Sequence, residues 1–200
     1  MKYLITHRTV YHYSSDVALC HNEARLLPRE TSWQQCHPSR VTIRPRPALS
    51  VERRDFFGNR VLYFVIQDIH QQLEVTVATG VRVLPTRQFT ESSPSPSWEQ
   101  ALAALREDPD PEIIDARQFM LDSPFVVAAP PFQEYAASSF LPGRPLLEAM
   151  ADLNRRIHRE FAYDPHFTTI ATPLDQVLAE RRGVCQDFAH LAMACLRALG

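Results

Sequence analysis

The chain has few cysteines, no long apolar run and no excess of basic residues, and each absence excludes a class of protein. Its 200 residues contain four cysteines without paired spacing, which argues against a small fold held by disulfides. A chain this long can bury a hydrophobic core without such bonds. No stretch approaches the roughly 20 apolar residues of a membrane-spanning helix, and the polar, charged N-terminal residues are unlike a signal peptide. We therefore expect a soluble, cytoplasmic protein with reduced thiols and no membrane partner.

The charge balance gives no reason to expect a nucleic-acid partner. The formal net charge is −2 at pH 7, whereas nucleic-acid-binding domains usually carry a basic face. Two Cys-His pairs, Cys20-His21 and Cys36-His37, match no usual zinc spacing. We expect neither a metal site nor a cofactor.

The first 85 residues have the pattern of an antiparallel β domain. Short runs rich in β-branched and aromatic residues cover 3–13, 17–27, 40–44, 61–67 and 73–84. Alternate residues of the first run share one face, as in a half-buried strand, namely Tyr3, Ile5, His7, Thr9, Tyr11 and Tyr13. Residues 55–60 predict a hairpin turn, since Gly58 and Asn59 tolerate positive φ. Several short strands with turns between them predict an antiparallel β-sandwich-like domain.

The periodicity becomes helical after residue 97. Ser97, with Gln100 three residues later, predicts a capping box for a helix over 98–105. Another helix should start at Thr172 and run to Arg182, where Gly183 would close it. A longer helix after Pro145 carries one apolar stripe, formed by Leu146, Leu147, Met150, Leu153, Ile157 and Phe161.

The polar, Pro/Ser-rich stretch at 86–96 separates the two patterns. The prediction is an α+β protein with a β-rich domain over 1–85, a linker over 86–96 and a helical domain over 97–200.

A cysteine at the start of the last helix is the strongest chemical signal in the sequence. Helical apolar spacing follows Cys185, at Val184, Phe188, Leu191, Ala192, Cys195, Leu196 and Leu199. A helix N-terminus favours an anion, and cysteines placed there often have a pKa of about 3.5–7.5 instead of about 8.5. The pattern is typical of a nucleophilic cysteine, although a buried thiol that opens a core helix would have the same spacing.

The residues around Cys185 resemble the nucleophile motif of the bacterial transglutaminase-like superfamily, whose core is papain-like. The motif is Gly183-Val184-Cys185-Gln186-Asp187-Phe188-Ala189, and the approach segments 161–165 and 172–174 also match. Residues 7–13, 25–29 and 55–59 are similar to the β-rich domain that precedes this core in many members. The resemblance implies that 97–200 is the helical half of a papain-like, transglutaminase-core domain.

That resemblance also implies a mechanism. Cys185 would be the catalytic residue of a thioester-forming hydrolase, protease or acyltransferase that acts on peptide or isopeptide amides, and hydrolysis is favoured. The family's His and Asp follow the cysteine helix, so we expect the sequence to be truncated after that helix and to be inactive by itself. The alternative is a non-catalytic module that binds a protein or peptide.

Other residues near the motif have simpler roles. His190 lies about 7.5 Å along the helix from Cys185 and cannot easily reach the thiol; no motif supports His158 or His166 as the base. Cys195 should be a small core residue, and Asp187 should stabilise the helix start. Tyr163 is either an active-site neighbour or a packed aromatic residue.

The truncation would also leave an apolar face of the last helix uncovered. Phe188, Leu191 and Leu196 would be exposed, and a homodimer could form through them.

Overall fold

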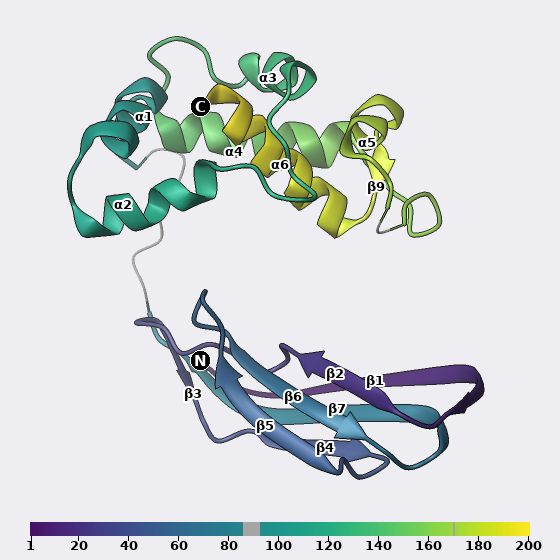
Figure 1. Cartoon of the computed structure of the whole chain (residues 1–200). Coiled ribbons are helices and arrows are strands. Elements are labelled where there is room, and N and C mark those ends of the chain that lie inside the picture. Colours follow the sequence, from purple (N-terminus) through teal and green to yellow (C-terminus); the bar gives the residue numbers. More distant parts are fainter. Residues whose placement is uncertain (86–92, 170) are drawn as a thin grey trace. The chain divides into compact units, whose positions relative to one another are not determined.

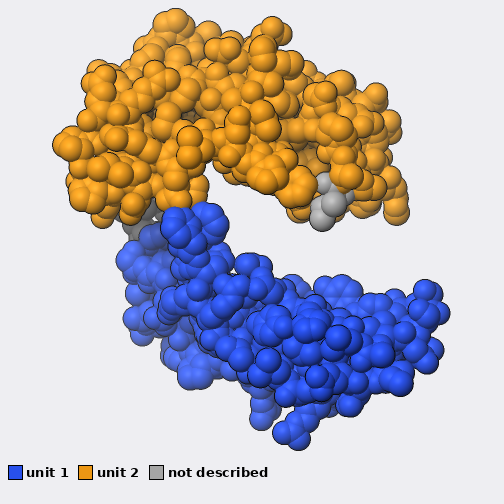
Figure 2. Space-filling model, viewed as in Figure 1, with its two compact units in different colours: residues 1–87 blue, residues 88–200 orange. Residues whose placement is uncertain are grey.

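The computed structural model describes residues 1–85, 93–169 and 171–200, and the chain forms two compact units, Met1–Arg87 and Gln88–Gly200 (Figure 2). The first unit is built from strands and the second mainly from helices (Figure 1), so the predicted α+β class is confirmed. Of the predicted linker 86–96, residues 86–92 lie outside the described residues. In the described ranges no helix is both long and apolar enough to cross a membrane.

The first unit consists of two antiparallel sheets. Its strands are β1 (Lys2–Val17), β2 (Cys20–Ala24), β3 (Gln34–Cys36), β4 (Arg40–Arg44), β5 (Leu49–Arg54), β6 (Arg60–Ile66) and β7 (His70–Val83). One sheet has the order β1-β7-β3, with β4 also paired to β7, and the other has the order β2-β6-β5. Alternate residues of β6 and β7, such as Phe64 and Leu73, form a shared core in which both side chains are almost fully buried.

The predicted half-buried face of the first strand is wrong at four positions. Tyr3, Ile5 and Tyr11 are 48%, 48% and 52% exposed, and His7 is exposed as well. The reason is that β1 lies at the edge of its sheet and pairs only with β7 among the described strands. The strand predicted over 17–27 is also shorter, because β2 covers only Cys20–Ala24.

The turn between β5 and β6 is where the sequence predicts it, but only one of its two residues has the expected backbone. Gly58 has φ 76°, whereas the φ of Asn59 is not positive. Instead, Asn59 donates its backbone N–H to Asp55 Oδ1 at 2.8 Å and its side-chain amide to Asp55 Oδ2 at 3.0 Å. The Asp55 carboxylate therefore closes the turn.

The second unit contains six α-helices, one 3₁₀ turn and two short strands in its described residues. They are α1 (Trp98–Glu107), α2 (Pro111–Arg117), η1 (Gln118–Met120), α3 (Pro130–Ala137), α4 (Leu146–Glu160), β8 (Ala162–Tyr163), α5 (Leu174–Glu180), β9 (Arg182–Gly183) and α6 (Cys185–Leu199). The predicted capping box of Ser97 and Gln100 is present at α1, and α4 begins directly after Pro145 as predicted. Ser95 and Pro96, at the end of the predicted linker, accept hydrogen bonds from the first amides of α4.

Helix α6 forms the centre of this unit, in contact with α3, α4 and α5 (Figure 1). Leu191 and Cys195 are fully buried there, together with Leu153 of α4 and Val177 of α5. The predicted exposed face of α6 is therefore wrong: Leu191 has no exposed surface, and Phe188 and Leu196 are half-buried. Helices of the same unit cover the residues through which a homodimer was expected.

Candidate active site

Cys185 is the first residue of α6, as predicted, and its side chain is exposed. Val184 before it is the N-cap and has an extended backbone, with φ −114° and ψ 176°. The first N–H groups of a helix have no partner within the helix, and they carry the positive end of its dipole. The backbone amide and the thiol of Cys185 thus lie together at an accessible, electropositive helix end.

The chain reaches this position through a short pair of parallel strands. Ala162 of β8 pairs with Arg182 of β9, and Tyr163 pairs with Gly183. The backbone N–H of Asp164 donates to the Gly183 carbonyl oxygen at 2.9 Å. These bonds join the entrance of α6 to the segment that follows α4.

The end of α5 differs from the prediction. The helix stops at Glu180, two residues before the predicted end at Arg182, and Arg181 has the left-handed conformation, with φ 55°. Gly183 therefore does not close the helix. A Cβ atom at Gly183 would lie 2.7 Å from Asp187 Oδ2 and 3.0 Å from Asp187 Cβ, so this position requires glycine because it has no room for a side chain.

Asp187 fills that space and stabilises the start of α6. Its Oδ2 atom accepts the Val184 backbone N–H at 2.8 Å and the Thr168 hydroxyl at 2.7 Å. The side chain is buried, at 9% exposure. The structural role predicted for Asp187 is thus confirmed, with directed hydrogen bonds adding to the charge effect. Thr168 is a residue that the sequence did not single out.

None of the histidines near the motif in sequence is bound to Cys185 in the described part of the chain. His190 stacks on Phe125, with ring centroids 6.2 Å apart and an 11° angle between the planes. His166 donates its backbone N–H to Asp164 Oδ1 at 3.0 Å. Among the described residues, no histidine forms a hydrogen bond or an ion pair with Cys185 that would make it the general base.

The sequence left two interpretations of Tyr163, an active-site neighbour or a packed aromatic residue. The structure does not show the packed position. Tyr163 is 66% exposed on β8, although its backbone pairs with Gly183. Its side chain is therefore accessible beside the entrance to α6.

The other three cysteines have less accessible positions. All four cysteines are free. Cys195 is fully buried, as predicted, and burial raises its pKa to about 12. Burial, together with the nearby Glu30 carboxylate, also raises the pKa of Cys36. Cys20 is half-buried, and its sulfur accepts a hydrogen bond from the Asn22 amide at 3.1 Å.

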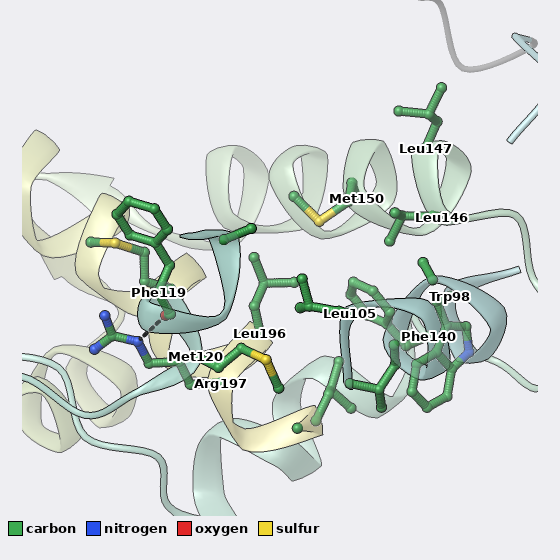
Figure 3. A pocket seen from close by; sticks show the side chains of 16 residues that line it. Trp98, Leu105, Phe119, Met120, Phe140, Leu146, Leu147, Met150, Leu196 and Arg197 are labelled. Atoms are coloured by element: carbon green, nitrogen blue, oxygen red, sulfur yellow. Dashed lines mark hydrogen bonds between the residues drawn. The ribbon is translucent and has the colours of Figure 1, made fainter. Parts of the chain in front are cut away.

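A large apolar cavity of about 660 Å³ lies towards the other end of α6 (Figure 3). Its walls include Trp98, Phe140, Met150 and Leu196, from four different parts of the unit. Met193, the cavity residue of α6 that is nearest to Cys185 in sequence, is eight residues away, which is about 12 Å along a helix. The cavity therefore does not surround the thiol, and we do not assign the reaction to it.

Two family models match the chain. Residues 3–82 match the bacterial transglutaminase-like N-terminal region, and residues 134–200 match the transglutaminase-like superfamily. Both agree with the resemblance found in the sequence, and the second match contains Cys185.

Similar proteins come from mycobacteria and from a solved bacterial structure. The uncharacterized proteins Rv2569c of Mycobacterium tuberculosis and Mb2599c of Mycobacterium bovis are each 41% identical over 201 residues, which cover 100% of this chain and 62% of the relative. A crystal structure of a candidate cysteine protease from Cytophaga hutchinsonii has a TM-score of 0.73 at 21% identity, covering 100% of this chain and 64% of that one. The chain thus spans less than two thirds of the length of these relatives, and the structural match shows a shared fold.

Proposed function

Because the chain belongs to the bacterial transglutaminase-like superfamily, we propose that it is part of a cysteine enzyme whose nucleophile is Cys185. One observation carries the proposal: of the four cysteines, only Cys185 is exposed, and it is the first residue of a helix. An exposed sulfur is open to a substrate, and the thiolate is the nucleophilic form of cysteine.

The proposed reaction is acyl transfer through a thioester. The Cys185 sulfur attacks the carbonyl carbon of a peptide or isopeptide amide, the C–N bond breaks, and the amine leaves with a proton. The Cys185 backbone N–H has no partner within the helix and is the donor that we assign to the oxyanion of the tetrahedral intermediate. Water then takes the acyl group, which makes the overall reaction a hydrolysis of a protein or peptide substrate.

The need for proton transfer limits the reactions that the described residues can carry out. An amine leaving group needs a proton, and general acids of this kind are usually histidines. No described histidine is bound to Cys185, so we expect this chain to form a thioester from an activated ester but to release no amine from a peptide amide. A phenolate leaves without a proton, which makes an ester the suitable test substrate.

The test is acetylation of the chain by p-nitrophenyl acetate near neutral pH. We expect release of p-nitrophenolate and a single acetyl group on Cys185, located by peptide mass spectrometry and lost in Cys185→Ser. The control is the acetylation rate of a free cysteine derivative under the same conditions. Acetylation of Cys185 no faster than this control, or slower than that of Cys20 or Cys36, would contradict the proposal and favour a non-catalytic binding module.

A further inference from the structure

The peptide group between Gly183 and Val184 is held by hydrogen bonds at both ends. Its carbonyl oxygen accepts the Asp164 N–H at 2.9 Å, and its own N–H donates to Asp187 Oδ2 at 2.8 Å. A peptide group is planar, so two bonds on opposite sides restrain it at both ends. The next peptide group along the chain carries the N–H of Cys185, and its direction depends on this one.

The carboxylate that holds this peptide group is itself held in place. The Thr168 hydroxyl donates to the same Oδ2 atom at 2.7 Å. Thr168 and Asp164 come from one segment, whose backbone turns where Phe167 N–H donates to Asp164 O at 3.4 Å. Because the Asp187 side chain is only 9% exposed, water cannot easily replace either bond when one is removed.

From this geometry we propose that Asp187, oriented by Thr168, is a positioning residue that directs the Cys185 backbone N–H towards the oxyanion. The inference rests on the proposed function, since it assigns a role within the same reaction. It differs from ordinary helix capping in what it predicts. A cap affects the stability of the helix, whereas a positioning residue affects acylation of Cys185 more than any other reaction of the same thiol.

Two reagents separate these effects. Acetylation by p-nitrophenyl acetate passes through a tetrahedral oxyanion, whereas alkylation by iodoacetamide is a direct displacement at carbon without one. Both need the Cys185 thiolate, so the ratio of the acetylation rate to the alkylation rate isolates stabilisation of the oxyanion. The variants are Asp187→Ala, Asp187→Asn and Thr168→Val.

A matched control removes a similar cap elsewhere in the same unit. Asp110 is the N-cap of α2, and its Oδ1 atom accepts the Glu112 N–H at 2.8 Å. Asp110→Ala should lower the melting temperature, because it removes a helix cap, and should leave the ratio at Cys185 unchanged.

We expect Asp187→Ala to lower the ratio about tenfold, the factor that corresponds to about 1.4 kcal/mol in the activation free energy. Asp187→Asn should restore most of it, because an amide oxygen of the same shape still accepts the Val184 N–H. Thr168→Val should give an intermediate value.

A wild-type ratio in Asp187→Ala, or an equal loss in Asp110→Ala, would overturn the positioning role. If circular dichroism shows that Asp187→Ala loses helix, Thr168→Val decides, since it removes one hydroxyl group and little volume. Wild-type Cys185 that is not acetylated faster than free cysteine would instead refute the proposed function, and the inference would fall with it.

Discussion

Replacing Gly183 with alanine should destabilise the helical unit through one identifiable contact. The new Cβ atom would lie 2.7 Å from Asp187 Oδ2, 3.0 Å from Asp187 Cβ and 3.2 Å from Asp187 Cγ. The 2.7 Å separation is too short for non-bonded atoms and the other two are tight, so the carboxylate must move. Moving it breaks its bonds with the Val184 N–H and the Thr168 hydroxyl.

The size of the effect follows from the bonds that are lost. A buried donor left without a partner costs about 1–3 kcal/mol. Alanine gives back about 0.4–1 kcal/mol, because it restricts the unfolded chain more than glycine does. We expect Gly183→Ala to lower the free energy of unfolding of this unit by about 1.3 kcal/mol, the difference between the midpoints of these two effects.

The unfolding of the helical unit has its own fluorescent probe. The chain has two tryptophans, and only Trp98 lies in this unit. Its ring packs against Phe140 at a centroid distance of 5.9 Å, and its Nε1–H donates to the Leu141 carbonyl oxygen at 3.0 Å. In a Trp33→Phe background, urea titration followed by tryptophan fluorescence reports the stability of this unit alone.

A double-mutant cycle tests the cause. In an Asp187→Ala background the contacts with Oδ2 and Cγ disappear, and the 3.0 Å contact with Cβ remains. The bonds that Gly183→Ala breaks are already absent in that background, so its cost should then fall close to zero. An undiminished cost in that background would refute the reasoning, because the strain would have to come from another source.

Two further predictions concern titratable groups. Iodoacetamide should label Cys185 before Cys36 and Cys195, since burial raises the pKa of both other thiols, that of Cys195 to about 12; earlier labelling of Cys36 in a peptide map would contradict this order. For Tyr135, burial and the hydrogen bond to Glu160 raise the pKa from 10.0 to about 12, so the folded state binds this proton more tightly than the unfolded state. The contribution of the protonated Tyr135 side chain to stability should be complete below about pH 10 and be lost as the pH rises towards 12. Urea titrations of wild type and Tyr135→Phe at rising pH test this. An equal loss of stability in both proteins would contradict it.

The parts of the fold that the sequence predicted well are those in which local pattern and tertiary packing agree. A run rich in β-branched residues predicted β7, in which Leu73 and Val75 are buried, and Ser97 with Gln100 predicted the start of α1. The prediction failed for β1, where the alternation is present but its edge position leaves Tyr3 and Ile5 half exposed. Alternation shows which residues share a face and does not show whether another layer covers that face.

Two short helices also escaped prediction. The seven residues of α2 and the eight of α3 each begin with proline and are too short to display a helical period clearly. The end of α5 depends on tertiary contacts in a similar way. The Arg181 guanidinium lies 4.7 Å from the centre of the Tyr135 ring and 4.9 Å from that of Phe161, and such cation–π contacts offset the cost of a left-handed arginine. No local rule gives these contacts.

The site was predicted only as far as its residues are contiguous. A glycine followed by helical spacing located Cys185 at the start of α6, whereas Thr168 lies 17 residues earlier in a polar stretch without a recognisable pattern. Thr168 reaches Asp187 only because β8 and β9 pair and return the chain beside the entrance of α6. A hydrogen bond between distant segments of this kind leaves no periodic signal in a single sequence.

The spacing of the motif itself now has a physical explanation. Gly183 and Asp187 are four residues apart, and the missing side chain of the first makes room for the carboxylate of the second. That carboxylate fixes the Gly183–Val184 peptide group, and Cys185 follows directly. Gly183 does not have positive φ. This position therefore requires glycine for the space left by the missing side chain and not for its conformational freedom. The two residues depend on each other: a larger residue at 183 displaces Asp187, and the loss of Asp187 leaves the Val184 N–H without its partner at the entrance to the nucleophile.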